Sequence, residues 1–81
     1  MMNERQFTRL LLESEQMLYR IACVLLRSEA DRQDAMQETA LKAWKNRASL
    51  REEQYFRTWI SRIMVNECHN LHRKTVMRNC G

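Results

Sequence analysis

The chain contains no proline, and its one glycine is the last residue, Gly81. Tight hairpin turns depend on residues that accept a positive φ, and glycine is the usual one. A sheet-rich fold would therefore lack its turns, whereas helices joined by short polar connections need neither residue. With 81 residues there is room for one domain with a modest core. We predict an all-α fold, a compact bundle of three main helices in a domain over residues 1–76, followed by a frayed tail at 77–81.

Helical periodicity places the first two helices. In residues 3–27 the apolar positions share one broad face, and they are Phe7, Leu10, Leu11, Leu18, Ile21, Ala22 and Leu25. Ser28 stands three residues before Asp31, which is typical of an N-cap with an acidic first turn. A second helix is therefore expected from Ser28 to about residue 47. Residues 48–54 break the apolar period and predict a connecting loop, and the 48–55 connection has room for one short extra helix.

The second helix separates into two faces. The face expected to pack inward carries Met36, Ala40, Ala43 and Trp44. The opposite face mixes carboxylates, an amide, a cation and an apolar side chain, and it consists of Asp34, Gln37, Glu38, Leu41 and Lys45. An apolar centre with a polar rim is typical of a small protein-binding patch. The alternative is a solvated face with one stray leucine, because single exposed apolar residues are normal.

A third helix is predicted over residues 55–74. Its apolar face consists of Phe56, Ile60, Ile63, Met64 and Leu71. Glu67 falls near the centre of this apolar face. We expect its carboxylate to form an ion pair with an Arg of another helix.

A second stripe on the third helix is polar, with Trp59 and Asn70 along its edge; it consists of Arg62, Asn66, His69 and Arg73. Cations attract phosphates, an indole offers a stacking surface, and an amide can form paired hydrogen bonds with a base edge. This combination favours nucleic acid as the ligand. The alternative is an ordinary amphipathic helix with a solvated basic face, and Trp59 could equally be a purely structural aromatic at the edge of the core.

The charge and the remaining motifs narrow the function further. The net charge is +4, and residues 51–81 carry 6 Lys or Arg against 3 Asp or Glu, so the basic excess coincides with the polar stripe. No catalytic constellation, phosphate-binding loop or cofactor motif is present, so we predict a binding module without cofactor rather than an enzyme. Cys68, His72 and Cys80 could approach one another, but no fourth ligand is evident, and no metal site is predicted. The apolar runs are too short for a membrane span or a signal peptide, which predicts a cytoplasmic protein.

Three segments together resemble region 2 of bacterial sigma factors, most closely the extracytoplasmic-function (ECF) group of the sigma-70 family. They are DRQDAMQETALKAW at 31–44, LR at 50–51 and FRTWISRIMVNECHNLHRK at 56–74. The resemblance covers roughly residues 15–75. It implies a compact helical domain that docks on the clamp helices of the RNA polymerase β′ subunit and recognises and melts the minus-ten promoter element. The alternative is a helical interaction bundle whose basic face binds an acidic protein partner rather than DNA.

The resemblance also assigns roles to residues. The acidic patch of the second helix becomes the polymerase-docking surface, formed by Asp34, Gln37, Glu38, Leu41 and Lys45. The 48–55 connection becomes the element that holds a flipped base of the non-template strand. Promoter DNA is expected to contact Arg51, Tyr55, Trp59, Arg62, Asn66, His69, Asn70, Arg73 and Lys74.

Some positions depart from the family pattern. Asn70 stands where many relatives carry Asp, and His69 and His72 are not typical, so the base preference cannot be carried over. The family normally continues into a helix-turn-helix domain, called region 4, which these 81 residues do not include. The resemblance further implies an anti-sigma factor as a partner.

Overall fold

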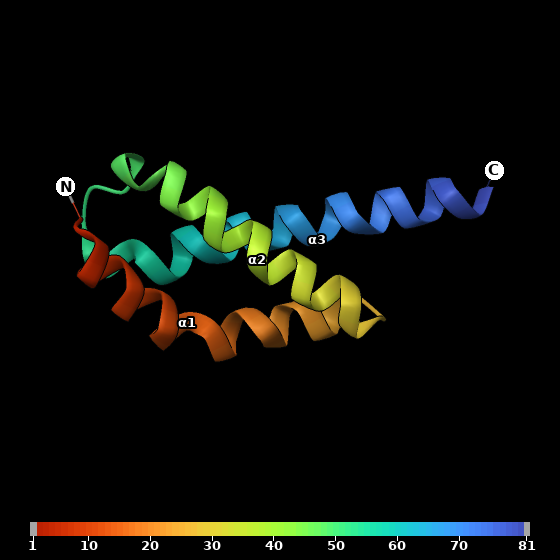
Figure 1. Cartoon of the computed structure of the whole chain (residues 1–81), viewed down its shortest axis with the longest axis horizontal. Coiled ribbons are helices and arrows are strands. Elements are labelled where there is room, and N and C mark those ends of the chain that lie inside the picture. The colour runs from red at the N-terminus through yellow and green to blue at the C-terminus, as the bar shows by residue number, and fades with distance from the viewer. Residues whose placement is uncertain (1, 81) are drawn as a thin grey trace.

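The computed structural model describes the backbone of residues 2–80 and the side chains of residues 2–74. Within this range the chain forms three α-helices joined by short connections. The order is α1 (Glu4–Leu25), α2 (Glu29–Lys45), the 3-10 turns η1 (Arg47–Ser49) and η2 (Glu53–Tyr55), and α3 (Phe56–Cys80). α2 runs antiparallel to its neighbours, so α1 and α3 point the same way (Figure 1). The prediction of an all-α bundle with short helical structure in the 48–55 connection is confirmed.

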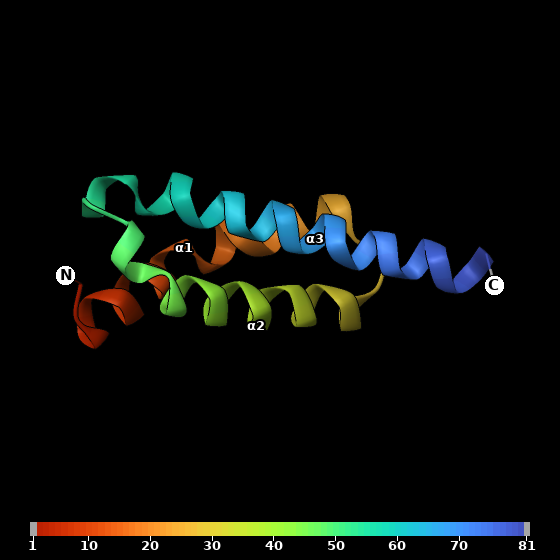
Figure 2. The same cartoon turned by 90° about the horizontal axis from the view of Figure 1, so that it is seen from above.

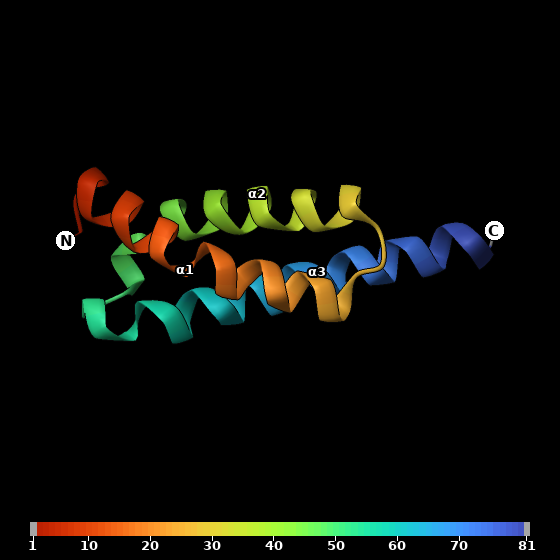
Figure 3. The ribbon, with the colours of Figure 1, turned by 90° about the horizontal axis from the view of Figure 1, so that it is seen from below.

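The three helices pack along one another, and α1 covers α2 and α3 from the lower side of Figure 1 (Figures 2 and 3). The C-terminal part of α3 extends beyond the turn between α1 and α2. α3 therefore continues past Lys74, where the sequence pattern fades. Gly81 and the side chains of residues 75–80 lie outside the described residues, so the frayed tail at 77–81 stays a prediction.

Side-chain caps fix where the first two helices begin. The Asn3 Oδ1 accepts a hydrogen bond from the Gln6 backbone N–H at 2.9 Å, and the Gln6 Oε1 accepts one from the Asn3 N–H at 3.2 Å. This reciprocal pair is a capping box, which satisfies two amide groups at the start of α1. The Ser28 Oγ accepts a hydrogen bond from the Asp31 N–H at 3.0 Å. The predicted cap of the second helix is thus confirmed.

A polar cluster holds the turn between α1 and α2. The Arg32 guanidinium donates to the carbonyl oxygens of Leu26 at 3.2 Å and Arg27 at 3.3 Å, where α1 has ended. The Tyr19 hydroxyl donates to Glu29 Oε2 at 2.6 Å, and this hydrogen bond lowers the pKa of the Glu29 carboxyl. The turn is therefore closed by hydrogen bonds and needs no glycine.

The core lies where all three helices meet. Aromatic rings fill the end of the core near the 48–55 connection. The ring centroid of Phe7 lies 5.1 Å from that of Trp44 and 5.9 Å from that of Phe56, and both pairs are edge-to-face. Arg47 stacks over the Trp44 ring at 3.6 Å and covers this end. The buried apolar residues are Phe7, Leu18, Ala22, Leu26, Ala35, Ala43, Phe56, Ile60, Met64 and Cys68.

The buried face of α2 differs from the predicted one. Ala35 and Thr39 are fully buried with Ala43, whereas the predicted Met36 and Trp44 are only half-buried, as is Ala40. Small residues at every fourth position let α2 approach α3 closely, and the Thr39 hydroxyl donates to the Met64 sulfur at 3.1 Å. Large apolar residues dominate a periodicity argument, so the small residues at the centre of the contact were missed.

Candidate functional site

The acidic face of α2 is open to solvent. Asp34, Gln37 and Lys45 are exposed, Glu38 is half-buried, and Leu41 is 52% exposed in their midst. The helix positions these side chains at intervals of three and four residues, so they form one continuous strip along α2. The strip presents two carboxylates, an amide and an apolar centre, which suits a basic and partly apolar protein surface.

The polar stripe of α3 is exposed as the sequence predicted. Arg62, Asn66, His69 and Arg73 all lie at the surface, as do Asn70 and Lys74. Within the part of the chain that the structure describes, the four stripe side chains make no hydrogen bond or ion pair, so their donors and acceptors are available to a ligand.

Trp59 lies at the edge of this stripe and is half-buried. Its ring centroid stands 5.7 Å from that of Phe56 in a tilted arrangement, and Phe56 is a core residue. The indole therefore packs on the core with one side and reaches the surface with the other. Both expectations for Trp59, a structural aromatic and a stacking surface, are compatible with this position.

An ion pair between a buried carboxylate and an exposed lysine lies between the α2 face and the α3 stripe. Glu67 is only 6% exposed, and its carboxylate accepts a hydrogen bond from the ammonium of Lys42 on α2. The expected ion pair exists, but the partner is a lysine and not the arginine that was predicted. The hydrogen bond to Glu67 raises the pKa of Lys42, so the ammonium stays charged at neutral pH.

Two hollows follow the seam between α2 and α3 on either side of this pair. One holds the acids of α2 opposite cations of α3, and it is lined in part by Asp34, Glu38, Asn70, Arg73 and Lys74. The other is lined by Lys42 of α2, by Asn46, which follows α2, and by residues of α3 that include Asn66, His69, Asn70 and Arg73. The structure thus brings the predicted polymerase-facing acids and the C-terminal half of the predicted DNA-binding set to one seam.

A third hollow of about 460 Å³ lies at the opposite end, beside the 48–55 connection. Its walls include Ala48, Leu50 and the exposed Arg51, together with Met2 and Gln6 from the start of the chain. Met2 and Gln6 were missed because only the fold brings them to the connection. The capping pattern of Asn3 and Gln6 would have fixed the start of α1 but not its neighbours.

The predicted DNA-binding residues do not form one cluster. Arg51 and the 57% exposed Tyr55 lie at the connection, whereas the other predicted residues follow α3 as far as Lys74. From Phe56 to Lys74 an α-helix rises about 27 Å at 1.5 Å per residue. The set is therefore an extended track with a hollow at one end rather than a closed pocket.

Neither a metal centre nor a membrane segment is found among the described residues. No group of three or more His, Cys, Asp or Glu side chains there could hold a metal ion. Cys68 is buried and His72 is exposed, and the Cys80 side chain lies outside the described residues. No described helix combines the length and the apolar character that crossing a bilayer requires.

Comparison with known proteins gives the family. Residues 10–77 match the family described as sigma-70 region 2, which is most of the chain and includes α2, the connection and the described side chains of α3. No significant match to a curated protein or to a solved structure was found. The chain therefore belongs to the sigma-70 region 2 family, a non-enzymatic family whose domains bind core RNA polymerase and recognise the minus-ten promoter element.

Proposed function

We propose that the two activities of the family are divided between two helices of this domain. The strip of Asp34, Gln37, Glu38, Leu41 and Lys45 on α2 docks on the clamp helices of the polymerase β′ subunit. The stripe of α3 and the 48–55 connection hold the non-template strand of the minus-ten element. By trapping unpaired bases of this strand they melt the duplex. The observation that carries this division is the stripe of exposed side chains on α3 that make no hydrogen bond or ion pair within the described residues.

The chemistry of the α2 strip supports polymerase docking. Exposed carboxylates steer and orient a basic partner, and Leu41 offers an apolar contact at the centre. Lys42 is turned from the strip toward Glu67, so one lysine charge is withdrawn from the acidic surface.

The length of the α3 track suits a short stretch of promoter DNA. About 27 Å of helix corresponds to about eight nucleotides at 3.4 Å each. Arg62, Arg73 and Lys74 would contact phosphates along this length, whereas Asn66 has the amide that can form paired hydrogen bonds with a base.

The hollow at the connection supports base trapping. Moving a base out of the DNA stack costs a few kcal/mol of free energy. A protein that melts DNA must therefore offer a site that binds the unstacked base. This hollow combines the apolar side chains of Leu50 and Met2 with the guanidinium of Arg51, which can stack on a base. Glu52 and Glu53 also line it, so it suits an uncharged base better than a phosphate.

The test is a selection with core RNA polymerase. The full chain and the core enzyme are mixed with a pool of DNA fragments that carry a short randomised and partly unpaired segment, and the bound fragments are sequenced. We expect enrichment of one sequence family that the core enzyme alone does not give. Equal pools with and without the chain would contradict DNA recognition by this domain.

The finer classification is also part of the proposal. The sequence pattern at residues 31–44 and 56–74 favours the ECF group, whose members act in the cytoplasm and are held inactive by an anti-sigma factor. The alternative of a basic face that binds only an acidic protein is not retained, because the family recognises promoter DNA.

A further inference from the structure

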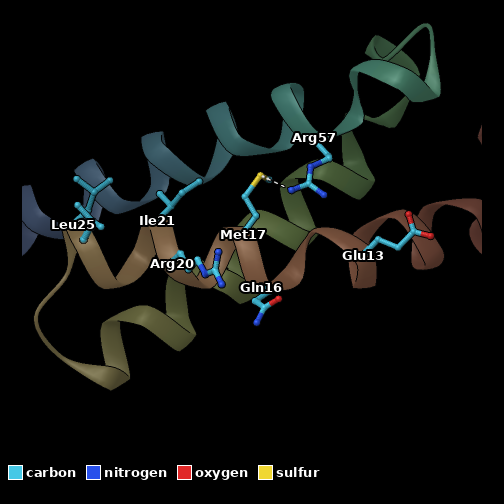
Figure 4. Close-up of a pocket in the computed structure, with 8 residues that line it drawn as sticks. Glu13, Gln16, Met17, Arg20, Ile21, Leu25 and Arg57 are labelled. Carbon is cyan, nitrogen blue, oxygen red and sulfur yellow. Dashed lines mark hydrogen bonds between the residues drawn. The ribbon is translucent and has the colours of Figure 1, made fainter.

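A groove of about 540 Å³ lies between α1 and α3, and no residue of α2 contributes to it (Figure 4). Its floor is formed by Met17, Ile21 and Leu25, which are half-buried against the core. Val24 stands at its edge with 83% of its surface exposed. The groove is thus an apolar surface that the fold leaves partly open.

This groove is separate from both proposed surfaces. Its one residue from α3 is Arg57, which lies nine positions before Asn66. At about 100° per residue, nine positions amount to about two and a half turns, so the two side chains leave α3 on opposite sides. The α2 strip takes no part in the groove either. A partner could therefore bind here while polymerase and DNA occupy the other faces.

The charges beside the apolar floor indicate what kind of partner fits. Arg20 of α1 makes no hydrogen bond or ion pair within the described part of the chain. Arg57 reaches from α3, and among the described residues it donates only to the Met17 sulfur, at 3.6 Å (Figure 4). The guanidiniums of Arg20 and Arg57, on opposite walls, thus have no carboxylate partner within residues 2–74. Glu13 is the one acid among the lining residues, and it stands 3.9 Å from Arg9 outside the groove.

The groove also has the length for a helix. Its α1 wall extends from Glu13 to Leu25, which is about 18 Å or three helical turns at 1.5 Å per residue. An amphipathic helix recognises such a groove through apolar residues at i, i+3, i+4 and i+7. We propose that this groove docks an acidic amphipathic helix of a partner protein, with apolar residues on Met17, Ile21 and Leu25 and carboxylates beside Arg20 and Arg57.

A second copy of the chain is the competing occupant, because its α2 strip also carries acids around a leucine. One observation disfavours it: Lys45 is exposed on that strip and would meet the arginines of the groove. The proposed docking of the strip on polymerase disfavours it as well.

The test uses two synthetic peptides and the full chain. Both peptides carry leucine at i, i+3, i+4 and i+7, and they differ only in having glutamates or lysines at the flanking positions. Fluorescence anisotropy measures binding, and nuclear magnetic resonance maps the amides that shift. We expect saturable binding of the glutamate peptide with shifts at residues 13–25 and 57, and binding of the lysine peptide at least about tenfold weaker.

Matched variants locate the interaction. The Arg20→Glu, Arg57→Glu double variant should weaken binding of the glutamate peptide by about tenfold, because two attractions become repulsions. Val24→Glu should also weaken it, since the change adds a like charge at an exposed position that does not support the fold. The control Arg5→Glu, Arg27→Glu makes the same change of net charge at exposed residues outside the groove, and it should bind as the unmodified chain does.

Several results would overturn the proposal. They are the absence of saturable binding, equal binding of both peptides, or an equal loss in the control variant. A dimer in sedimentation that only the Arg20→Glu, Arg57→Glu variant abolishes would assign the groove to a second copy instead. Binding of the unmodified chain to core polymerase is measured in parallel. Its absence, together with saturable binding of the glutamate peptide, would count against the proposed function and not against the groove.

Discussion

The buried carboxylate of Glu67 on α3 accepts a hydrogen bond from the ammonium of Lys42 on α2. Glu67 adjoins Asn66 of the stripe that is proposed to bind DNA, and Lys42 adjoins Leu41 of the strip that is proposed to bind polymerase. The pair therefore fixes the register between the two helices that carry the proposed activities. A carboxylate in this position would be costly without its cation, so the pair specifies one alignment of α2 on α3.

Removing the cation should destabilise the fold more than removing the pair. Lys42→Ala leaves the Glu67 carboxylate buried without a partner, whereas Glu67→Gln removes the charge itself. We expect Lys42→Ala to lower the urea midpoint more in the unmodified chain than in a Glu67→Gln background. A double-mutant cycle by urea unfolding measures this difference. Additive effects of the two changes would mean that the pair does not couple the helices.

Alkaline pH should weaken the fold, and Lys42 and Cys68 are two of the groups responsible; the hydrogen bond to Glu29 also raises the pKa of Tyr19. The folded-state pKa of Lys42 is raised by Glu67, so the stability from its charge is fully present below the ordinary value of 10.5 and is lost as pH rises through the folded pKa. Burial raises the pKa of the Cys68 thiol in the same direction, and its contribution is lost above the ordinary value of 9.0. The free energy of unfolding should therefore fall as the pH rises above about 9.

Two variants separate these contributions. Cys68→Ala should remove the part of the loss that begins near pH 9. Lys42→Met should reduce the loss above the ordinary lysine pKa, where Tyr19 also contributes. Denaturant unfolding at several pH values measures both. If the free energy of unfolding depended on pH in the same way in the unmodified chain, Cys68→Ala and Lys42→Met, the assignment to these groups would be refuted.

The cap of α2 should be measurable as a stability difference. The Ser28 Oγ accepts the Asp31 N–H, so Ser28→Ala leaves this amide without its partner and should cost about 1 kcal/mol. Ser28→Asp restores a carboxylate acceptor and should recover most of the loss in thermal unfolding. If alanine and aspartate gave equal stability, the side chain of residue 28 would not act as a cap.

Asn66 should determine the preference for one base. Asn66→Ala is expected to lower discrimination at one promoter position by about 1–3 kcal/mol, as a lost paired contact does. Competition between DNA fragments for the complex of chain and core polymerase measures this value. Gln16→Ala is the matched control, because Gln16 is an exposed amide on α1, away from the stripe. An unchanged preference in Asn66→Ala, or an equal change in Gln16→Ala, would refute the role.

The sequence predicted the features that depend on local pattern. The absence of internal glycine and proline and the 3.6-residue period indicated three helices, and Ser28 marked the start of α2 correctly. The exposed stripe on α3 followed from the same periodicity, because residues at i, i+4, i+7 and i+11 share a side of any helix. Local chemistry was sufficient for each of these.

Features that depend on how helices meet were not predictable in this way. Lys42 and Glu67 are 25 positions apart, and only the register of α2 on α3 brings them together. The burial of Ala35 and Thr39 was missed because small side chains contribute little to apolar periodicity. The groove beside Arg57 requires the crossing of α1 over α3, which no single helix pattern contains.

The most direct test of the central claim is a nuclear magnetic resonance titration of the full chain with an isolated fragment of the β′ clamp helices. The account predicts saturable shifts centred on Asp34, Gln37, Glu38 and Leu41, and a loss of these shifts in a folded Glu38→Lys variant, whose reversed charge repels a basic partner. Shifts confined to the α3 stripe, or no shifts in a folded sample, would contradict the division of polymerase and DNA between α2 and α3.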